Sequence, residues 1–195
     1  MREAVHIIGG GLAGSEAALS LAKRGVPVVL HEMKEVKKTP AHTSDNFAEL
    51  VCSNSFKSER EDSAAGALKS ELKMLGSELL PMIYEARVPA GGALAVDRER
   101  FSNLVTQKIL TNPNIELIKE EVSSLDVSRR LIVAAGPLAS EALSAHILEL
   151  TGSQGLSFYD AAAPIVEADS LDMDILFSQS RYKKVEGADY LNAPF

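Results

Sequence analysis

Three glycines at a fixed spacing are the first residues of the chain with a recognisable chemical use. Gly9, Gly11 and Gly14 follow the apolar run 4–8 and precede a helical pattern over 15–25. In a strand–turn–helix unit, this spacing allows a tight turn, a close approach of the backbone to a pyrophosphate, and close packing of helix on strand. The free N–H groups at the start of the helix then face the phosphates. We therefore expect the turn to bind a dinucleotide through Gly9, Gly10, Gly11, Leu12, Ala13 and Gly14.

Glu32 has the position and the charge to hold the sugar of such a ligand. It ends the apolar stretch 26–32, 18 residues after Gly14. Its carboxylate can accept hydrogen bonds from ribose hydroxyls, whereas a 2′-phosphate would meet like charge there. The pattern therefore disfavours NADP at this site and leaves FAD and NAD open. A glycine-rich turn without any ligand is the alternative, which the flanking strand, helix and acid make the weaker interpretation.

Gly136 ends a second apolar run of the same kind, within "LIVAAGP". In a doubly wound sheet, such a strand end lies near the crevice where the cofactor binds. An ordinary strand-to-helix turn explains the residue equally well, so both interpretations stay open at this point.

Cys52 is the only cysteine, in the stretch "FAELVCSNSFKS". A single cysteine excludes an internal disulfide and every metal site built on several cysteines, and we expect no metal. A free cysteine is often a small buried hydrophobe. It can instead be a nucleophile where nearby cations or a helix N-terminus lower its pKa. The residues alone favour the buried hydrophobe.

The other polar clusters are predicted to be solvated. They comprise the loop residues His42 and Asp45, the basic cluster Lys34, Lys37 and Lys38, and the acidic residues Glu167, Asp169, Asp172 and Asp174. The acidic residues lack a metal-ligand spacing with any histidine.

Hydrophobic periodicity predicts an α/β fold with a mostly parallel sheet and helices on both faces. Strands are expected at 4–8, 26–32, within 88–96, in one or two stretches between 112 and 126, at the run ending in Gly136, and at 161–166. Helices are expected at 15–25, 63–84, 97–110 and 140–150, with Asp97 as an N-cap and with Gly76 and Pro81 weakening the second helix. The polar connection 33–62 is long enough to suggest a functional role.

Composition sets the broad class of the protein. The chain has 195 residues, 46% of them hydrophobic and 24% charged, and a net charge of −7. This balance is typical of a globular domain and argues against a chain-wide electrostatic footprint for nucleic acid. We see no signal peptide and no transmembrane span, so the expected location is cytoplasmic.

Several stretches, in order along the whole chain, resemble one family. They are "GGGLAGSEAA", "TPAHTSDNFAELVCSNS", "VPAGGALAVDRERF", "AAGPLASEAL", "FYDAAAPIVEADSLDMD" and "SRYKKVEGADYLNAP". The chain is similar to the N-terminal part of the folate- and FAD-dependent tRNA (uracil-5-)-methyltransferases. "AELVCSNS" and "FYDAAAPIV" are the most specific of these stretches, since "GGGLAGSEAA" also resembles a related flavoprotein of tRNA wobble-uridine modification.

The resemblance implies a fold, a reaction and a set of ligands. It implies an FAD-binding Rossmann-type domain over 1–165, incomplete at its C-terminal end, and the start of a substrate-side domain over 166–195. Methylenetetrahydrofolate would supply the carbon, reduced FAD the electrons, and NAD(P)H the reduction of the flavin, to methylate C5 of a uridine in the tRNA T-loop. Cys52 would be catalytic, either in attack on the base or in handling the one-carbon unit. A missing C-terminal half or a second chain would complete the enzyme.

Three alternatives remain at this stage. The same chemistry could act on ribosomal RNA. The chain could be a truncated, non-catalytic flavin-binding remnant. It could also be a flavin oxidoreductase of small molecules.

Overall fold

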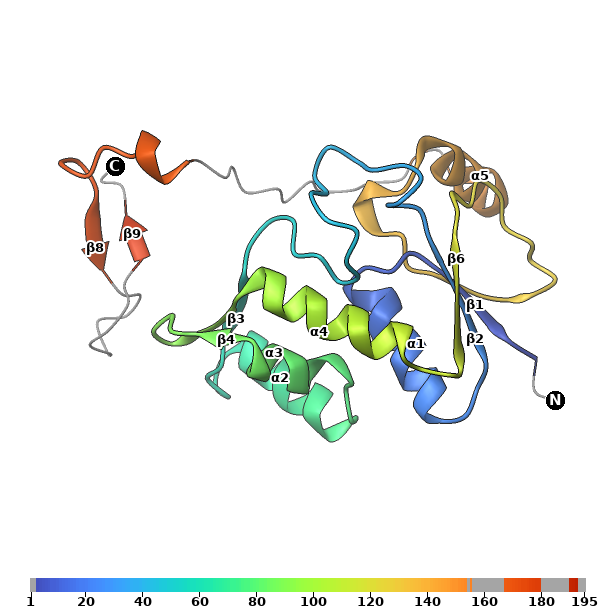
Figure 1. Cartoon of the computed structure of the whole chain (residues 1–195), viewed down its shortest axis with the longest axis horizontal. Helices are drawn as coiled ribbons and strands as arrows, with labels where there is room; N and C mark the ends of the chain where they lie inside the picture. The colour runs from blue at the N-terminus through green and yellow to red at the C-terminus, as the bar shows by residue number, and fades with distance from the viewer. Residues whose placement is uncertain (1–2, 154, 156–166, 180–189, 193–195) are drawn as a thin grey trace. The chain divides into compact units, whose positions relative to one another are not determined.

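The structure is a computed structural model that describes residues 3–153, 155, 167–179 and 190–192 (Figure 1). It divides into two compact units. The first comprises Met1–Val51 with Ser102–Ala161, and the second comprises Cys52–Phe101 with Ala162–Phe195.

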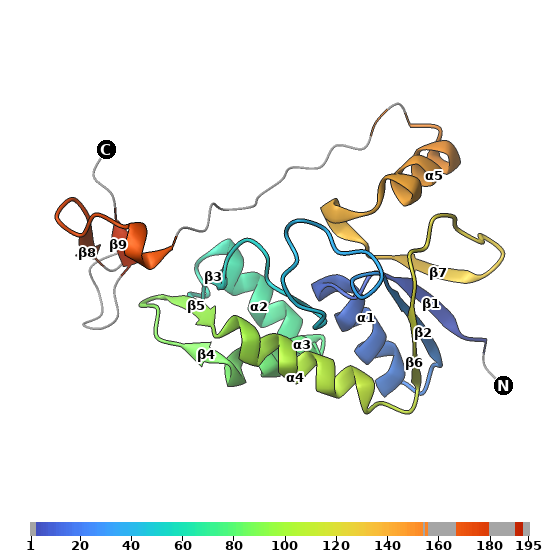
Figure 2. The same cartoon turned by 45° about the horizontal axis from the view of Figure 1, so that its top comes forward.

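The first unit is built on a four-stranded parallel sheet. Its strands are β1 (Val5–Ile8), β2 (Val28–Glu32), β6 (Ile115–Lys119) and β7 (Arg130–Val133). Figure 2 shows them side by side in the order β6-β2-β1-β7. From β1 the chain adds β2 and β6 on one side and then β7 on the other side. The strand order therefore reverses at β1, and ligands of open α/β sheets bind at the carboxyl end of the strands at such a switch point. The expected α/β class with a mostly parallel sheet is confirmed.

Helix α1 (Leu12–Lys23) packs on this sheet through its small and apolar face. Ala18, Leu19 and Ala22 are buried on the helix, as are Ile7 and Leu30 on the strands. Apolar burial of this kind contributes roughly 25 cal/mol per Å² and holds the turn between β1 and α1 in a fixed place. The helix begins at Leu12, three residues before the expected start, so the last glycine of the turn lies within it.

Side-chain caps begin two further helices, and the cap at Asp97 was predicted from the sequence. In α4 (Arg98–Leu110), the Asp97 side chain accepts a hydrogen bond from the backbone N–H of Arg100 at 2.9 Å. In α5 (Glu141–Thr151), Ser140 accepts from the N–H of Leu143, and Gly152 ends the helix with φ +63°. The short 3₁₀ helix η1 (Gly136–Leu138) connects β7 to α5. Such caps satisfy backbone groups that the helix leaves unpaired.

The second unit contains an antiparallel sheet of order β3-β5-β4. Its strands are β3 (Ser55–Ser58), β4 (Arg87–Val88) and β5 (Ala93–Val96), and its helices are α2 (Ala64–Met74) and α3 (Leu79–Glu85). The prediction of one helix over 63–84 was wrong. Gly76, with φ +75°, ends the first helix in a left-handed turn that a continuous helix cannot contain. Strand β3, inside the long connection, was not predicted.

The C-terminal residues that are described form η2 (Ala168–Ser170) and the antiparallel pair β8 (Phe177–Gln179) and β9 (Tyr190–Asn192). The expected strand at 161–166 and the expected domain boundary at 165 lie outside the described residues, and both stay predictions. Within the described ranges, no helix is both long and apolar enough to span a bilayer.

Candidate functional site

A cavity of about 260 Å³ opens at the carboxyl end of the first unit's sheet. Its wall is formed by the glycine turn, the ends of β1 and β2, the residues after β6 and β7, and part of the connection that follows β2. The lining includes seven of the predicted residues: Gly9, Gly10, Gly11, Leu12, Ala13, Glu32 and Gly136. The fold thus brings predicted residues from both sides of β1 to one cavity, as expected for a ligand site at the point where the strand order reverses.

The start of α1 offers this cavity unpaired backbone donors. Gly11 is the N-cap residue, and a glycine has no side chain that could accept a hydrogen bond from the first N–H groups of the helix. No acidic residue lies in the first turn of the helix. The N–H groups and the positive end of the helix dipole therefore face the cavity with no acidic side chain from the helix's own first turn beside them, an arrangement that favours phosphate.

The second and third glycines of the spacing, Gly11 and Gly14, test whether a dinucleotide fits. A Cβ atom placed on Gly11 would have no atom within 4 Å, so the space beside this residue is free for a ligand. A Cβ atom on Gly14 would stand 1.8 Å from the carbonyl oxygen of Gly9, because helix and turn are in close contact there. Gly14 is buried and does not line the cavity, so the structure places it under the turn. The cradle fits the pyrophosphate of a dinucleotide such as FAD.

Glu32 points at the glycine turn. Its Oε2 accepts a hydrogen bond from the N–H of Gly10 at 2.7 Å, and its Oε1 accepts one from the N–H of Lys34 at 2.9 Å. These two donors fix the carboxylate at the cavity wall. Each oxygen keeps a second lone pair that can accept from a sugar hydroxyl.

The connection after β2 folds back onto the glycine turn. The N–H of Ala48 donates to the carbonyl of Gly10 at 2.9 Å, and the N–H of Phe47 donates to Thr106 Oγ1 on α4 at 2.9 Å. Phe47 and Ala48 are buried, and Ala48 has φ 52°, which is unusual for a residue other than glycine. This docking brings His42, Glu49 and Val51 to the cavity.

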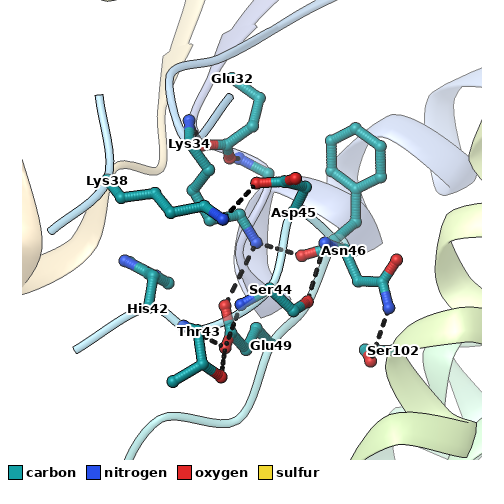
Figure 3. Close-up of polar contacts among 12 residues, drawn as sticks. Glu32, Lys34, Lys38, His42, Thr43, Ser44, Asp45, Asn46, Glu49 and Ser102 are labelled. Carbon is teal, nitrogen blue, oxygen red and sulfur yellow. Dashed lines mark hydrogen bonds and ion pairs between the residues drawn. The ribbon is translucent and has the colours of Figure 1, made fainter. Parts of the chain in front are cut away.

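A buried ion pair lies in this docked segment. The side chains of Lys34 and Glu49 are only 4% and 11% exposed, and Lys34 Nζ lies 3.6 Å from Glu49 Oε2. Figure 3 shows Lys34 Nζ also donating to the carbonyl of Asn46. The prediction that Lys34 lies on a solvated face was wrong, since the loop closes over it. Lys37 and Lys38 do lie at the surface, in ion pairs with Glu121 and Asp45.

Hydrogen bonds keep Glu49 ionised. Burial raises the pKa of its carboxyl, but the backbone N–H and hydroxyl of Thr43, the N–H of Ser44 and the charge of Lys34 outweigh burial and hold the pKa below its usual value. All three hydrogen bonds go to Oε1, at 2.9 to 3.1 Å.

His42 is half-buried at the cavity wall, where a solvated loop was predicted. Its Nδ1 lies 2.7 Å from Thr39 Oγ1. Burial and, next, the charge of Lys34 lower the pKa of His42 below its ordinary value. The ring is therefore neutral at pH 7.

His31 is a cavity residue that the sequence analysis missed. It is buried in β2, with Nδ1 2.8 Å from Glu120 Oε1 and Nε2 3.0 Å from Nδ1 of His6. The signal available in the sequence was a titratable residue in the middle of a buried strand, directly before Glu32. Such a residue is seldom buried without a polar partner.

Cys52 lies where the second unit begins, directly after the cavity residue Val51. Its thiol is free and partly exposed. The residue is intermediate in exposure, so the buried-hydrophobe interpretation and the reactive role both stay predictions.

Comparison with known proteins gives a consistent set of relatives. The family model described as glucose inhibited division protein A matches residues 4–195. The methylenetetrahydrofolate--tRNA-(uracil-5-)-methyltransferase TrmFO of Bacillus licheniformis is 55% identical over 194 residues, which are 100% of this chain and 44% of that protein. The proteins of the same name from Bacillus subtilis (strain 168) and Streptococcus pneumoniae are 55% and 51% identical, over 99% and 97% of this chain.

The chain therefore spans under half the length of these relatives, 43 to 44%. Among solved structures, Aquifex aeolicus GidA is similar with a TM-score of 0.50 at 20% identity, over 64% of this chain and 20% of that one. At that identity the likeness concerns the fold, which agrees with the parallel sheet and glycine turn described above.

Proposed function

Since the chain belongs to the glucose inhibited division protein A family, we propose that it is the FAD-binding, N-terminal part of a tRNA (uracil-5-)-methyltransferase that uses methylenetetrahydrofolate. The observation that carries the proposal is identity of 51 to 55% to proteins of that name over almost the whole chain. The dinucleotide cradle and Glu32 support the cofactor. Because the chain spans 44% of these relatives, the activity proposed is that of the whole protein.

Different residues of this chain would hold the pyrophosphate and a ribose of FAD. The N–H groups at Gly11, Leu12 and Ala13 bind the pyrophosphate, and Glu32 accepts hydrogen bonds from a ribose. Gly136 lines the opposite wall, beyond β1. When bound and reduced, FAD supplies the electrons that convert the one-carbon unit of the folate into a methyl group.

Cys52 is the proposed nucleophile. In this proposal the thiolate adds to C6 of the uracil, and C5 becomes nucleophilic and takes the one-carbon unit of the folate. The C5 proton is lost, the bond between the carbon and the folate nitrogen breaks to release tetrahydrofolate, and the sulfur leaves C6 once the carbon has received the electrons that reduced FAD would supply. The base must leave its stack to reach a protein nucleophile. Ser53 Oγ, which accepts a hydrogen bond from the N–H of Ser55 at 3.1 Å, illustrates the polar turn that surrounds this cysteine.

Finer features complete the proposal. The target is a T-loop uridine, NAD(P)H re-reduces the flavin, and the protein acts in the cytoplasm. These features rest on the resemblance of the motifs and on the tRNA named in the relatives' activity.

The test follows labelled carbon. We expect a chain extended to the relatives' full length to transfer label from methylenetetrahydrofolate to tRNA, and expect Cys52→Ala to abolish transfer while the flavin spectrum is retained. Ser53→Ala, at the adjacent small polar residue, is the matched control and should keep most of the activity.

The outcomes separate the alternatives. Label in ribosomal RNA alone would replace tRNA as the substrate. Unchanged transfer by Cys52→Ala would remove Cys52 from the mechanism. A protein that binds FAD but transfers nothing to either RNA would contradict the methyltransferase proposal and leave the cofactor site standing.

A further inference from the structure

Glu120 presents an accessible carboxylate to the cavity beside the glycine turn. The residue follows strand β6 directly, lines the cavity, and has a side chain that is 49% exposed. Its Oε1 lies 2.8 Å from Nδ1 of His31, and the imidazole is the donor because a carboxylate only accepts. Each carboxylate oxygen has more than one lone pair, so Glu120 can accept a further hydrogen bond from a ligand.

Two contacts within the chain hold Glu120 in place. His31 is buried in β2, and its Nε2 lies 3.0 Å from Nδ1 of His6, so both nitrogens of the imidazole that binds Glu120 have a partner. The backbone N–H of Glu120 donates to the carbonyl of Glu32 at 3.0 Å. The acceptor therefore stands beside Glu32 before a ligand binds, which lowers the entropic cost of a contact there.

The strand order gives the direction in which a dinucleotide crosses the sheet. Strands β1, β2 and β6 are consecutive neighbours (Figure 2), and Glu32 pairs with Lys119 at the end of β6. Neighbouring strands lie about 4.8 Å apart. The glycine turn follows β1, Glu32 ends β2 and Glu120 follows β6, so three groups that can bind a ligand succeed one another along the carboxyl edge.

The chemistry of FAD decides which part of it comes to β6. FAD contains one ribose, that of its adenosine part, and the phosphate and the base leave this sugar at opposite ends. A pyrophosphate at the glycine turn and a ribose at Glu32 therefore direct the adenine beyond β2, toward β6. The exocyclic N6 amine is the polar donor of adenine, whose ring nitrogens accept. A carboxylate, which only accepts, can bind that amine.

We propose that Glu120 accepts a hydrogen bond from the N6 amine of the adenine of bound FAD, and so makes this end of the cavity selective for an aminated purine. The inference rests on the proposed FAD site. It adds to that site a specificity-determining residue beyond β2, which the spacing of the glycines and Glu32 does not indicate.

A cycle of one substitution and one ligand change measures the contact. The ligands are ADP and the 5′-diphosphate of purine riboside, which lacks only the amine, and calorimetric titration gives their affinities for the 195-residue chain and for Glu120→Ala. We expect the wild type to bind ADP about tenfold more tightly than the analogue, as for a hydrogen bond to a charged group. Glu120→Ala should bind the two ligands alike, within about twofold, because the acceptor is gone.

Glu116→Ala is the matched control. Glu116 lies on the same strand, is exposed, and is not among the residues that line the cavity. The variant removes one negative charge from β6, as Glu120→Ala does beside it, and should keep the tenfold preference for ADP. Equal loss of this preference in both variants would assign the effect to net charge and would overturn the inference.

The ratio of the two affinities distinguishes contact from folding. A smaller folded fraction weakens both apparent affinities by the same factor and leaves their ratio unchanged. If the wild type binds ADP and the analogue equally, or if Glu120→Ala keeps the preference of the wild type, the inference fails while the FAD site stands. If the wild type binds neither FAD nor ADP, the proposed cofactor site fails and the inference fails with it.

Discussion

Glu32 and Glu49 are two carboxylates on one cavity wall that the chain holds in different ways. Glu32 receives one backbone donor on each oxygen, from Gly10 and Lys34. Glu49 receives all its donors on one oxygen and has a buried lysine beside the other. The arrangement at Glu32 fixes a charged acceptor at the cavity wall before any ligand binds. Preorganisation of this kind lowers the entropic cost of binding.

His42 is expected to titrate below its ordinary range, because burial and the charge of Lys34 disfavour its protonated form. The unfolded chain then binds more protons than the folded one. The stability that neutral His42 contributes is thus fully present above about pH 6.5, the unfolded value, and is lost as pH falls toward the lower folded pKa.

An NMR titration of the ring checks this pKa directly. Urea unfolding at several pH values should show stability falling through this window in the wild type and falling less in His42→Gln. A ring that titrates at or above pH 6.5 would show that the Lys34 ammonium does not act on it as described.

The turn between β1 and α1 combines two glycines that serve different ends. Gly14 is required by close packing of helix on turn, whereas Gly11 faces open space. The distinction separates a folding requirement from a binding requirement within four residues.

Alanine substitutions should separate these requirements. Gly14→Ala should cost about 3 kcal/mol of unfolding free energy, since its methyl would overlap the Gly9 carbonyl. Gly11→Ala should change stability by less than about 0.5 kcal/mol, yet weaken FAD binding more than tenfold, because its methyl would occupy the approach of the pyrophosphate. Urea unfolding and flavin fluorescence measure the two effects. Full FAD binding by Gly11→Ala would place the pyrophosphate elsewhere.

The docked segment depends on a strained backbone at Ala48. Its φ of 52° suits glycine, and a β-branched residue there would be a severe outlier. Ala48→Val should therefore destabilise the protein by about 2 kcal/mol or more and weaken FAD binding. Ala48→Gly should remain within about 1 kcal/mol of the wild type, because relief of strain and loss of a buried methyl group offset one another. Equal stability of the valine and glycine variants would show that this segment is not held as described.

At the scale of the whole chain, the 195 residues carry a net charge of −7 and span 44% of the length of the Bacillus licheniformis relative. Recognition of tRNA requires cations to contact phosphates. We therefore expect much of the cationic surface of the proposed enzyme to lie outside these 195 residues.

A complementation experiment tests whether the 195 residues bind FAD while the remaining length of the protein supplies the tRNA contacts. We expect the 195 residues to bind FAD, and expect labelled-carbon transfer to tRNA to rise at least tenfold when a second chain supplies the remaining length of a relative. Transfer at the full rate by the 195 residues by themselves would show that they contain the tRNA surface.

The local pattern of the sequence determined the βαβ unit, the parallel sheet, the helix cap at Asp97, and the pairing of the glycine turn with Glu32. These features depend on short-range periodicity and on residue types with one dominant local use, which a sequence displays directly. Only the tertiary structure shows that part of the connection 33–62 folds over the glycine turn and lines the cavity. Burial of Lys34, the place of His42 and Glu49 at the cavity and the partners of His31 depend on contacts between residues distant in sequence, such as Ala48 with Gly10 and Phe47 with Thr106. Periodicity does not report contacts of that kind, because a polar loop has the same composition whether it is solvated or folded over a ligand site.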